Sequence, residues 1–441
     1  MRSTPWPATK IVLSDLHIGA GYADQGNRLE DFTQDAALIG LIDQLEDESK
    51  ARNLPMELVL NGDIFEFWQV PALPEGESFC PTKRYPVRRY LRTRAKDSCR
   101  RMRLIIQGHA ALFGALARFI QSDGARRTLT ILKGNHDVQL HWEAVQAIIR
   151  DALGATDERY DLVLFPSRSV SREGVYIEHG SEYADALNRH PDFDLPYHPR
   201  DPRRLRMVPG GPMYIRVINR LERQHYWVSS VKPTSAILWY LLRFDPWTAL
   251  RMLVLAAPLL PRWLWLHRPM TRTNRQLARE LQAIEASLDK ESASSDAKRL
   301  PECPHEGDDL KGLINLPSLQ AVLAEEAGGD DPLLVRGLLE EHSLHARMKQ
   351  VAQLKARQEQ ACVVLFGHTH LPAAEPLDRG AVYMNTGSWT WMLDLRHQPA
   401  DAWRRLIRDA DHDDVHYHLT YARVNYDAEG RPRASLREYH E

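Results

Sequence analysis

The pattern of apolar and polar positions predicts five short, buried strands. Each is a run of four or five residues rich in β-branched and aliphatic side chains, which is typical of strands covered on both faces. The runs span residues 10–14, 57–61, 128–132, 175–178 and 362–366. Apolar spacing of helical period predicts helices at 28–53 and 141–153, and a helix-like stretch at 103–120 in which we interpret His109 as structural. A layered α/β fold follows.

Every one of these strands ends in a short polar cluster. The clusters are Asp15-Leu16-His17, Gly62-Asp63, Gly134-Asn135-His136-Asp137, His179-Gly180 and Gly367-His368-Thr369-His370. In layered α/β folds, ligands bind in the crevice at the carboxyl ends of the strands, so we expect the clusters to meet. Glycine suits the tight turns and close backbone approaches that such a site needs.

The side chains in these clusters are those of a two-metal site. Two divalent cations about 3.5 to 4 Å apart can clamp the attacking and leaving oxygens of a phosphoester, and they need a bridging carboxylate with imidazole and oxygen ligands. The candidate ligands are Asp15, His17, Asp63, Asn135, His179, His368 and His370. Mixed nitrogen and oxygen ligation favours two divalent ions such as Mn²⁺, and it leaves Fe, Co and Zn open.

The order of the clusters resembles that of the calcineurin-like metallophosphoesterases, over residues 8–180 and about 360–390. The resemblance implies a four-layer sandwich, in which two mixed β-sheets are flanked by helices. It also implies a division of the seven ligands between two metals. One metal would be held by Asp15, His17 and His370, the other by Asn135, His179 and His368, with Asp63 bridging both.

The run from Gly62 to Trp68 resembles one subfamily of these enzymes in particular. Its sequence, Gly-Asp-Ile-Phe-Glu-Phe-Trp, is similar to the Gly-Asp-Leu-Phe-Glu-x-Trp of bacterial UDP-2,3-diacylglucosamine diphosphatases. Those enzymes usually carry Arg where this chain has His136, and they are much shorter. Other large bacterial phosphoesterases share His136 and the segment 179–188. The substrate is therefore left open between lipid-linked and nucleotide-linked compounds, a UDP-diacyl sugar among them.

His136 and Asp137 are candidates for catalysis. A histidine titrates near neutrality, so His136 can donate to the leaving oxygen or stabilise charge on the phosphoryl group, and an adjacent carboxylate can orient it. The alternative is that His136 only contacts the substrate phosphate. The simplest nucleophile is a hydroxide that bridges the two metals, because the cations lower the pKa of bound water.

The long interval between His179 and His368 predicts a large insertion. The numbering advances by 189 with mainly helical composition, far more than a connection needs. We expect a metallophosphoesterase domain in two parts, 1–204 and 345–441, around a helical cap at 205–344 that contains an exposed linker near 285–312. A charged amphipathic helix at 333–360 is predicted to return the chain to the sheet.

Two segments bear on the partners of the protein. Residues 236–266 are apolar and rich in tryptophan but too interrupted by charges and prolines to span a membrane, so they form either the core of the cap or an interfacial anchor. Residues 83–103 carry a basic cluster that contacts an anionic substrate or membrane, or is a solvated face. We expect a phosphorylated small-molecule or lipid-linked substrate, with peripheral contact to a membrane as a further hypothesis.

Composition indicates a soluble cytoplasmic enzyme, with the inner membrane surface as a place of peripheral contact. The chain has 441 residues, 43% hydrophobic content and a net charge of -2, enough for a large core. Its cysteines, Cys80, Cys99, Cys303 and Cys362, are scattered, which predicts no disulfide and a reducing compartment. The first residues lack the apolar segment of a signal peptide.

The C-terminal region predicts two more strands. Residues 380–389 resemble the closing strand and turn of the family. Alternation at Val415, Tyr417, Leu419 and Tyr421 predicts a half-buried strand, with His416 and His418 on its solvated face.

Three classes of function are compatible with these features. The first is a dinuclear-metal hydrolase of phosphoester or pyrophosphate bonds. The second is a phosphodiesterase or nuclease of the same fold, which the near-neutral net charge disfavours. The third is a non-catalytic scaffold with this fold, which would be expected to have lost ligands.

Overall fold

The computed structural model describes most of the chain. The described residues are 8–121, 124–184, 186–232, 236–259, 332–395, 398–409 and 415–440, with the single residues 279, 283, 286 and 303. The predicted linker at 285–312 lies outside them except for residues 286 and 303.

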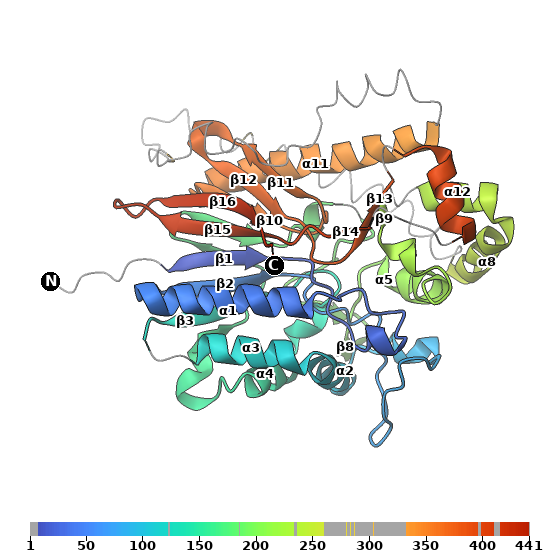
Figure 1. The fold of residues 1–441 in the computed structure, drawn as a ribbon, viewed down its shortest axis with the longest axis horizontal. Helices are drawn as coiled ribbons and strands as arrows, with labels where there is room; N and C mark the ends of the chain where they lie inside the picture. The colour runs from blue at the N-terminus through green and yellow to red at the C-terminus, as the bar shows by residue number, and fades with distance from the viewer. Residues whose placement is uncertain are drawn as a thin grey trace.

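Two mixed β-sheets form the centre of the molecule (Figure 1). The six-stranded sheet has the order β16-β15-β1-β2-β3-β4, and the five-stranded sheet has the order β11-β12-β10-β6-β5. The first comprises β1 (Thr9–Leu13), β2 (Met56–Asn61), β3 (Arg127–Leu132), β4 (Val163–Leu164), β15 (Thr420–Tyr426) and β16 (Pro432–Glu438). The second comprises β5 (Ser169–Arg172), β6 (Val175–Glu178), β10 (Val363–Phe366), β11 (Pro372–Pro376) and β12 (Val382–Thr386).

The strands that carry the polar clusters are central and parallel in both sheets. β1, β2 and β3 pair in parallel, as do β6 and β10, so their carboxyl ends lie at one edge of each sheet. Val12, Val59 and Leu365 belong to the buried apolar cluster between the two sheets. All five predicted strands are present, within one residue at either end.

Helices cover the outer face of each sheet and complete four layers. The six-stranded sheet is covered by α1 (Asp35–Arg52), α2 (Ala95–Gly108), α3 (Ala110–Ile120) and α4 (Glu143–Ala152). α11 (Pro332–Glu359) lies on the five-stranded sheet, where Met348 and Val351 pack with Tyr176, Val364 and Phe366 (Figure 1). The predicted α/β sandwich of two mixed sheets flanked by helices is confirmed.

Two helices differ from their predicted limits because tertiary contacts override local periodicity. α1 begins at Asp35 rather than at residue 28, and Glu30 instead accepts hydrogen bonds from the backbone nitrogens of Gly19 (2.9 Å) and Gly21 (2.5 Å). The stretch 103–120 is divided at His109, whose Nδ1 bonds to Asp35 Oδ1 at 2.7 Å. His109 lies outside the clusters of candidate metal ligands found among the described residues.

A cap lies beside the sandwich. It contains α5 (Gly211–Met213), a π-helical turn (Tyr214–Ile218), α6 (Asn219–Leu221), α7 (Ile237–Phe244), α8 (Pro246–Ala256) and α12 (Ala400–Asp409). A three-stranded sheet of β14 (Val415–His416), β13 (Met392–Asp394) and β9 (Val231–Lys232) joins it, and β7 (Tyr197–His198) pairs with β8 (Asp201–Leu205) nearby in sequence.

The cap core is built from two distant parts of the sequence. Trp403 of α12 stacks on Tyr240 of α7 with ring centroids 4.4 Å apart, and Leu393 of β13 joins the same buried cluster. β13 and α12 therefore pack with the insertion, whereas β15 and β16 return to the six-stranded sheet, although the sequence grouped all four with the catalytic part. The division of the chain into the three predicted segments stays a prediction.

Two sequence predictions are wrong. The structure joins Cys303 to Cys362 in a disulfide, with Cα atoms 5.3 Å apart across 59 residues of sequence. Sequence spacing carried no signal of this pair, because the two cysteines are brought together by tertiary packing. Cys303 also lies beside Arg379, whose carbonyl oxygen accepts from the Cys303 backbone nitrogen at 3.4 Å. The predicted strand through residues 415–421 is also broken, because Val415 and His416 pair with β13 whereas Thr420 begins β15.

Within the described residues, no helix is both long enough and apolar enough to span a bilayer.

Candidate metal centre

The predicted ligands meet where the two sheets end. Asp15 and His17 follow β1, Asp63 follows β2, and His179 follows β6. Six of the seven predicted ligands form two candidate clusters, in each of which the ligand atoms lie within 4.8 Å of one another, and a third group within this distance joins His17 to Glu66 and His136. The clusters are Asp15, His17 and His370, and Asp63, His179 and His368.

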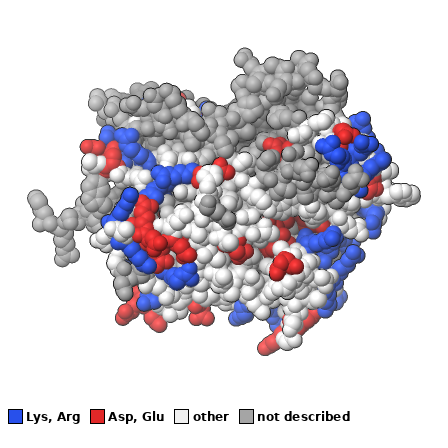
Figure 2. All heavy atoms as spheres, in the orientation of Figure 1, with Lys and Arg blue, Asp and Glu red and all other residues white. Residues whose placement is uncertain are grey.

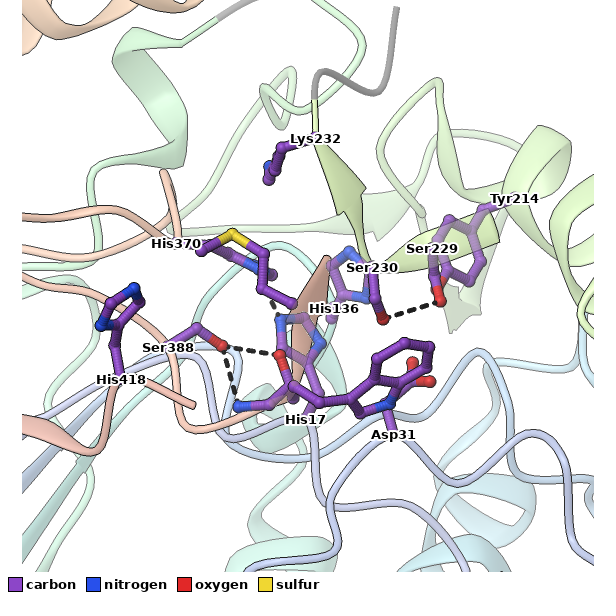
Figure 3. Close-up of a pocket in the computed structure, with 13 residues that line it drawn as sticks. His17, Asp31, His136, Tyr214, Ser229, Ser230, Lys232, His370, Ser388 and His418 are labelled. Atoms are coloured by element: carbon purple, nitrogen blue, oxygen red, sulfur yellow. Dashed lines mark hydrogen bonds between the residues drawn. The ribbon is translucent and has the colours of Figure 1, made fainter. Parts of the chain in front are cut away.

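Short distances between the candidate ligand atoms show that these side chains point at common centres. His17 Nε2 lies 3.2 Å from His370 Nε2, and His370 Nε2 lies 3.4 Å from Asp15 Oδ1. In the second cluster, His179 Nε2 lies 3.3 Å from Asp63 Oδ2. Figure 3 shows His17, His136 and His370 close together among the residues that line the cleft.

Several ligand atoms are buried without a hydrogen-bond partner. Buried polar atoms are almost always paired in proteins, so each orphan needs an explanation. They are Asp15 Oδ1, Asn135 Oδ1, His179 Nε2 and His368 Nδ1. Carboxylate, amide oxygen and imidazole form a donor set that fits first-row divalent cations, so the residues present fit two metal ions, while the identity of the metal stays a prediction.

The electrostatics of the site also favour positive charge. Burial lowers the pKa of His17, but the hydrogen bond and charge of Glu66 outweigh it and raise this pKa to about 9. Burial likewise opposes protonation of His179, yet the charges of Asp63 and Asp15 raise its pKa to about 10. The carboxylates thus stabilise positive charge at His17 and His179, whereas burial lowers the pKa of His368 to about 3 and that of His370 well below its usual value.

The backbone at the site is strained. Asp15, His17, Asp63, His368 and His370 have φ between 49° and 71°, a region that costs L-residues on the order of 1 to 3 kcal/mol each. Surrounding hydrogen bonds hold this conformation, because Asp15 N donates to Gly62 O (3.1 Å) and His17 N donates to Asp63 O (3.0 Å). Strain of this kind clusters at functional sites.

Gly134 is required by a close approach to Asp63. A β-carbon at position 134 would overlap Asp63 Oδ1 and lie 2.5 Å from the Asp63 backbone nitrogen. We expect Gly134→Ala to displace the Asp63 carboxylate and to lower both metal content and any metal-dependent activity by about a hundredfold. Elemental analysis and rate measurements check this.

The control for this prediction is Gly114→Ala in α3, where the nearest atom to a new β-carbon is 4.0 Å away. This change should leave metal content intact and slightly stabilise the helix. Equal metal content in the two variants would contradict the role given to Gly134.

Glu66 is a site residue that the sequence did not single out. Its fully buried carboxylate accepts hydrogen bonds through Oε2 from His17 Nδ1 (2.9 Å) and His136 Nδ1 (2.5 Å). Burial raises the pKa of Glu66, but the charges and hydrogen bonds of His136 and His17 outweigh it and bring this pKa to about 2. Glu66 therefore orients a metal ligand and a catalytic candidate at once, as outer carboxylates do in metal sites.

His136 and Asp137 occupy different environments. The His136 ring lines the cleft and stacks on Trp68 with centroids 3.7 Å apart. The Asp137 carboxylate accepts from the backbone nitrogens of Gly134 (2.5 Å) and Ile64 (2.8 Å). The carboxylate that orients His136 is thus Glu66. Asp137 instead connects the loops that follow β2 and β3 through its hydrogen bonds to Ile64 and Gly134.

A cleft of about 110 Å³ opens onto the first cluster, and the cap forms one of its walls. The insertion contributes Tyr214, Ser229, Ser230 and Lys232 to the lining. Later in the chain, Ser388, Thr390, Trp391, Met392 and His418 also line the cleft. His418, which the sequence placed on the solvated face of a strand, instead lies in the break between β14 and β15, where it is half-buried and lines the cleft.

Comparison with known proteins adds little to this geometry. No protein-family model and no curated protein matches the sequence. Among solved structures, the chain is similar to a dimetal phosphatase from Danio rerio, with 10% identity over 99% of this chain and 100% of that chain, at a TM-score of 0.30. A likeness this low supports no conclusion. The fold and ligand set alone define an α/β sandwich with a candidate dinuclear metal centre.

Proposed function

We propose that this protein hydrolyses phosphoester or pyrophosphate bonds with the help of two divalent cations. The observation that carries the proposal is the pair of adjacent ligand clusters at the ends of two facing sheets, with donor atoms left unpartnered. When bound, two such cations activate water at neutral pH and neutralise charge on phosphoryl oxygens.

The residues beside the ligands suit proton transfer to a leaving group. Because Nδ1 of His136 is hydrogen-bonded to Glu66, Nε2 is the ring nitrogen that can bond to a group bound in the cleft. Glu66 holds the ring through Nδ1, and Trp68 fixes the plane of the ring by stacking. His136 is therefore placed to donate to a leaving oxygen.

A second cavity favours a substrate with an aliphatic part. This groove has a volume of about 720 Å³ and lies between the segment 84–90 and the cap. Its apolar wall includes Leu29, Ile215, Leu250 and Val254. Trp247 at its edge is 75% exposed. Ile215 directly follows Tyr214, which lines the cleft, so one segment contributes to both cavities.

The groove is also lined by arginines that lack acidic partners. They are Arg84, Arg220, Arg223 and Arg251, none of which is in an ion pair with a described carboxylate. Arg223 and Arg251 donate to neutral acceptors, so the guanidinium groups of this apolar groove keep an uncompensated positive charge among the described residues, which suits an amphiphilic, anionic molecule. We propose a lipid-linked phosphate or pyrophosphate as the substrate class, and peripheral contact with anionic membranes remains part of this proposal.

The nuclease alternative has less support. Within the basic cluster at 83–103, Arg101 is buried and donates to the carbonyl oxygens of Arg89 and Tyr90. Lys83 and Arg89 both pair with Glu77. Figure 2 shows acidic and basic side chains interspersed over the visible face, whereas a nucleic-acid footprint needs a continuous basic surface.

A panel of substrates tests the proposal. The purified protein is assayed with Mn²⁺, Fe²⁺, Co²⁺ or Zn²⁺ on an aryl monoester, an aryl bis-ester, a sugar diphosphate with and without acyl chains, and single-stranded DNA. We expect hydrolysis that EDTA abolishes and added metal restores, with preference for the acylated diphosphate. Preferential cleavage of DNA would support the nuclease alternative. If no substrate were hydrolysed with any metal, the non-catalytic scaffold would be the remaining class of function.

A further inference from the structure

The cleft contains one lysine or arginine among its described lining residues, and the cap supplies it. This residue is Lys232, at the end of β9. Figure 3 shows its side chain at the rim of the cleft, on the same side as His370. The one lysine of the described cleft lining therefore comes from a part of the chain outside the predicted catalytic segments.

The small cap sheet fixes where the Lys232 side chain begins. β9 pairs in parallel with β13, where Val231 opposes Leu393 and Lys232 opposes Asp394. The Leu395 backbone nitrogen donates to the carbonyl oxygen of Lys232 at 3.0 Å. Since successive side chains of a strand point to opposite faces, the burial of Val231 in the cap core directs Lys232 the other way, towards the cleft.

Lys232 has no acidic partner in the described part of the chain. Asp31, the carboxylate that shares the cleft lining with it, is bonded instead to Gln69 Nε2 at 3.1 Å. The lysine is half-buried, so its ammonium group is partly removed from water without a counter-ion. A charge in that position is stabilised by an anion that enters the cleft.

We propose that Lys232 binds non-bridging oxygens of the substrate phosphoryl group from the cap side of the cleft. The inference rests on the proposed function and adds to it a cap residue that contacts the substrate. A phosphate monoester carries two negative charges near neutral pH, and a diester carries one. Lys232 therefore favours the dianionic group, and it recognises product phosphate in the same way.

The test compares Lys232→Met and Lys232→Arg with Lys50→Met, a change on the exposed surface of α1. Binding of inorganic phosphate to the Mn²⁺-loaded proteins is measured by calorimetry, and metal content by elemental analysis. We expect Lys232→Met to weaken phosphate binding by about tenfold or more, as the loss of a charge-assisted hydrogen bond implies. The phosphate affinity of Lys232→Arg should stay within about threefold of that of the parent protein. The phosphate affinity of Lys50→Met should equal that of the parent protein.

Kinetics provide the second measurement. In Lys232→Met, kcat/KM for an aryl monoester should fall by about tenfold or more, and by less for an aryl bis-ester, with both metals retained. An active parent protein whose Lys232→Met variant keeps phosphate affinity and both rates within about twofold would overturn the role of Lys232 alone. A parent protein that hydrolyses none of these esters would overturn the proposed function itself.

Discussion

Replacing Asp63 by asparagine is expected to empty both metal positions and to lower phosphoester hydrolysis by about a thousandfold or more. Asp63 Oδ1 accepts from the His136 backbone nitrogen at 2.7 Å, and Oδ2 lies 3.3 Å from His179 Nε2. The buried carboxylate is thus held by one oxygen while the other faces the second cluster. Asparagine keeps the shape and the backbone contact but removes the negative charge that two cations would share.

The control is a ligand that belongs to one cluster. His370 lies with Asp15 and His17, so His370→Ala should lose mainly one metal and retain about one ion per chain. Elemental analysis of both variants after identical purification separates the cases. If Asp63→Asn retained two ions per chain, Asp63 would not be the bridging ligand.

The strands and the candidate ligands could be predicted because their signals are local. An uninterrupted apolar run predicts a buried strand wherever it occurs, and parallel strands bring their carboxyl ends to one edge of a sheet. His179 and Asp63 are 116 positions apart in sequence, yet both end a predicted strand, which was enough to place them together.

Other features depend on contacts that no local pattern encodes. Glu66 lay within a quoted motif, but its role appears only when His17 and His136 are seen to share its carboxylate. Lys232 lay in a short strand of two residues, which has no periodicity to detect. The Cys303–Cys362 disulfide and the place of His418 in the cleft likewise follow from how distant segments pack.

The disulfide changes one further expectation. The prediction of a reducing compartment rested on cysteines that appeared to be unpaired, and the bond between Cys303 and Cys362 removes that support. Cys362 directly precedes β10, the strand that leads to His368 and His370. The bond therefore fixes residue 303 of the insertion to the strand that carries two candidate ligands.

Replacing His136 by alanine is expected to lower turnover by about a hundredfold or more while both metals stay bound. His136 is not among the seven proposed ligands, and its Nδ1 is bonded to Glu66, although it also lies with His17 and Glu66 in a third group of possible ligand atoms, so metal content is measured alongside the rate. A suitable control is His141→Ala, five positions along the chain, because His141 does not line the cleft. Elemental analysis and steady-state rates of the two variants give the comparison.

The way in which the loss of rate in His136→Ala depends on the leaving group distinguishes two roles of His136. If its Nε2 donates a proton to the leaving oxygen, the loss in His136→Ala should be large for an alkyl phosphate, whose leaving oxygen needs the proton, and small for a nitrophenyl phosphate, whose leaving oxygen does not. If His136 only contacts the phosphate, both substrates should lose the same factor. Near-normal turnover of the alkyl phosphate would remove His136 from the mechanism, and the contact with Glu66 would then serve only to orient His17.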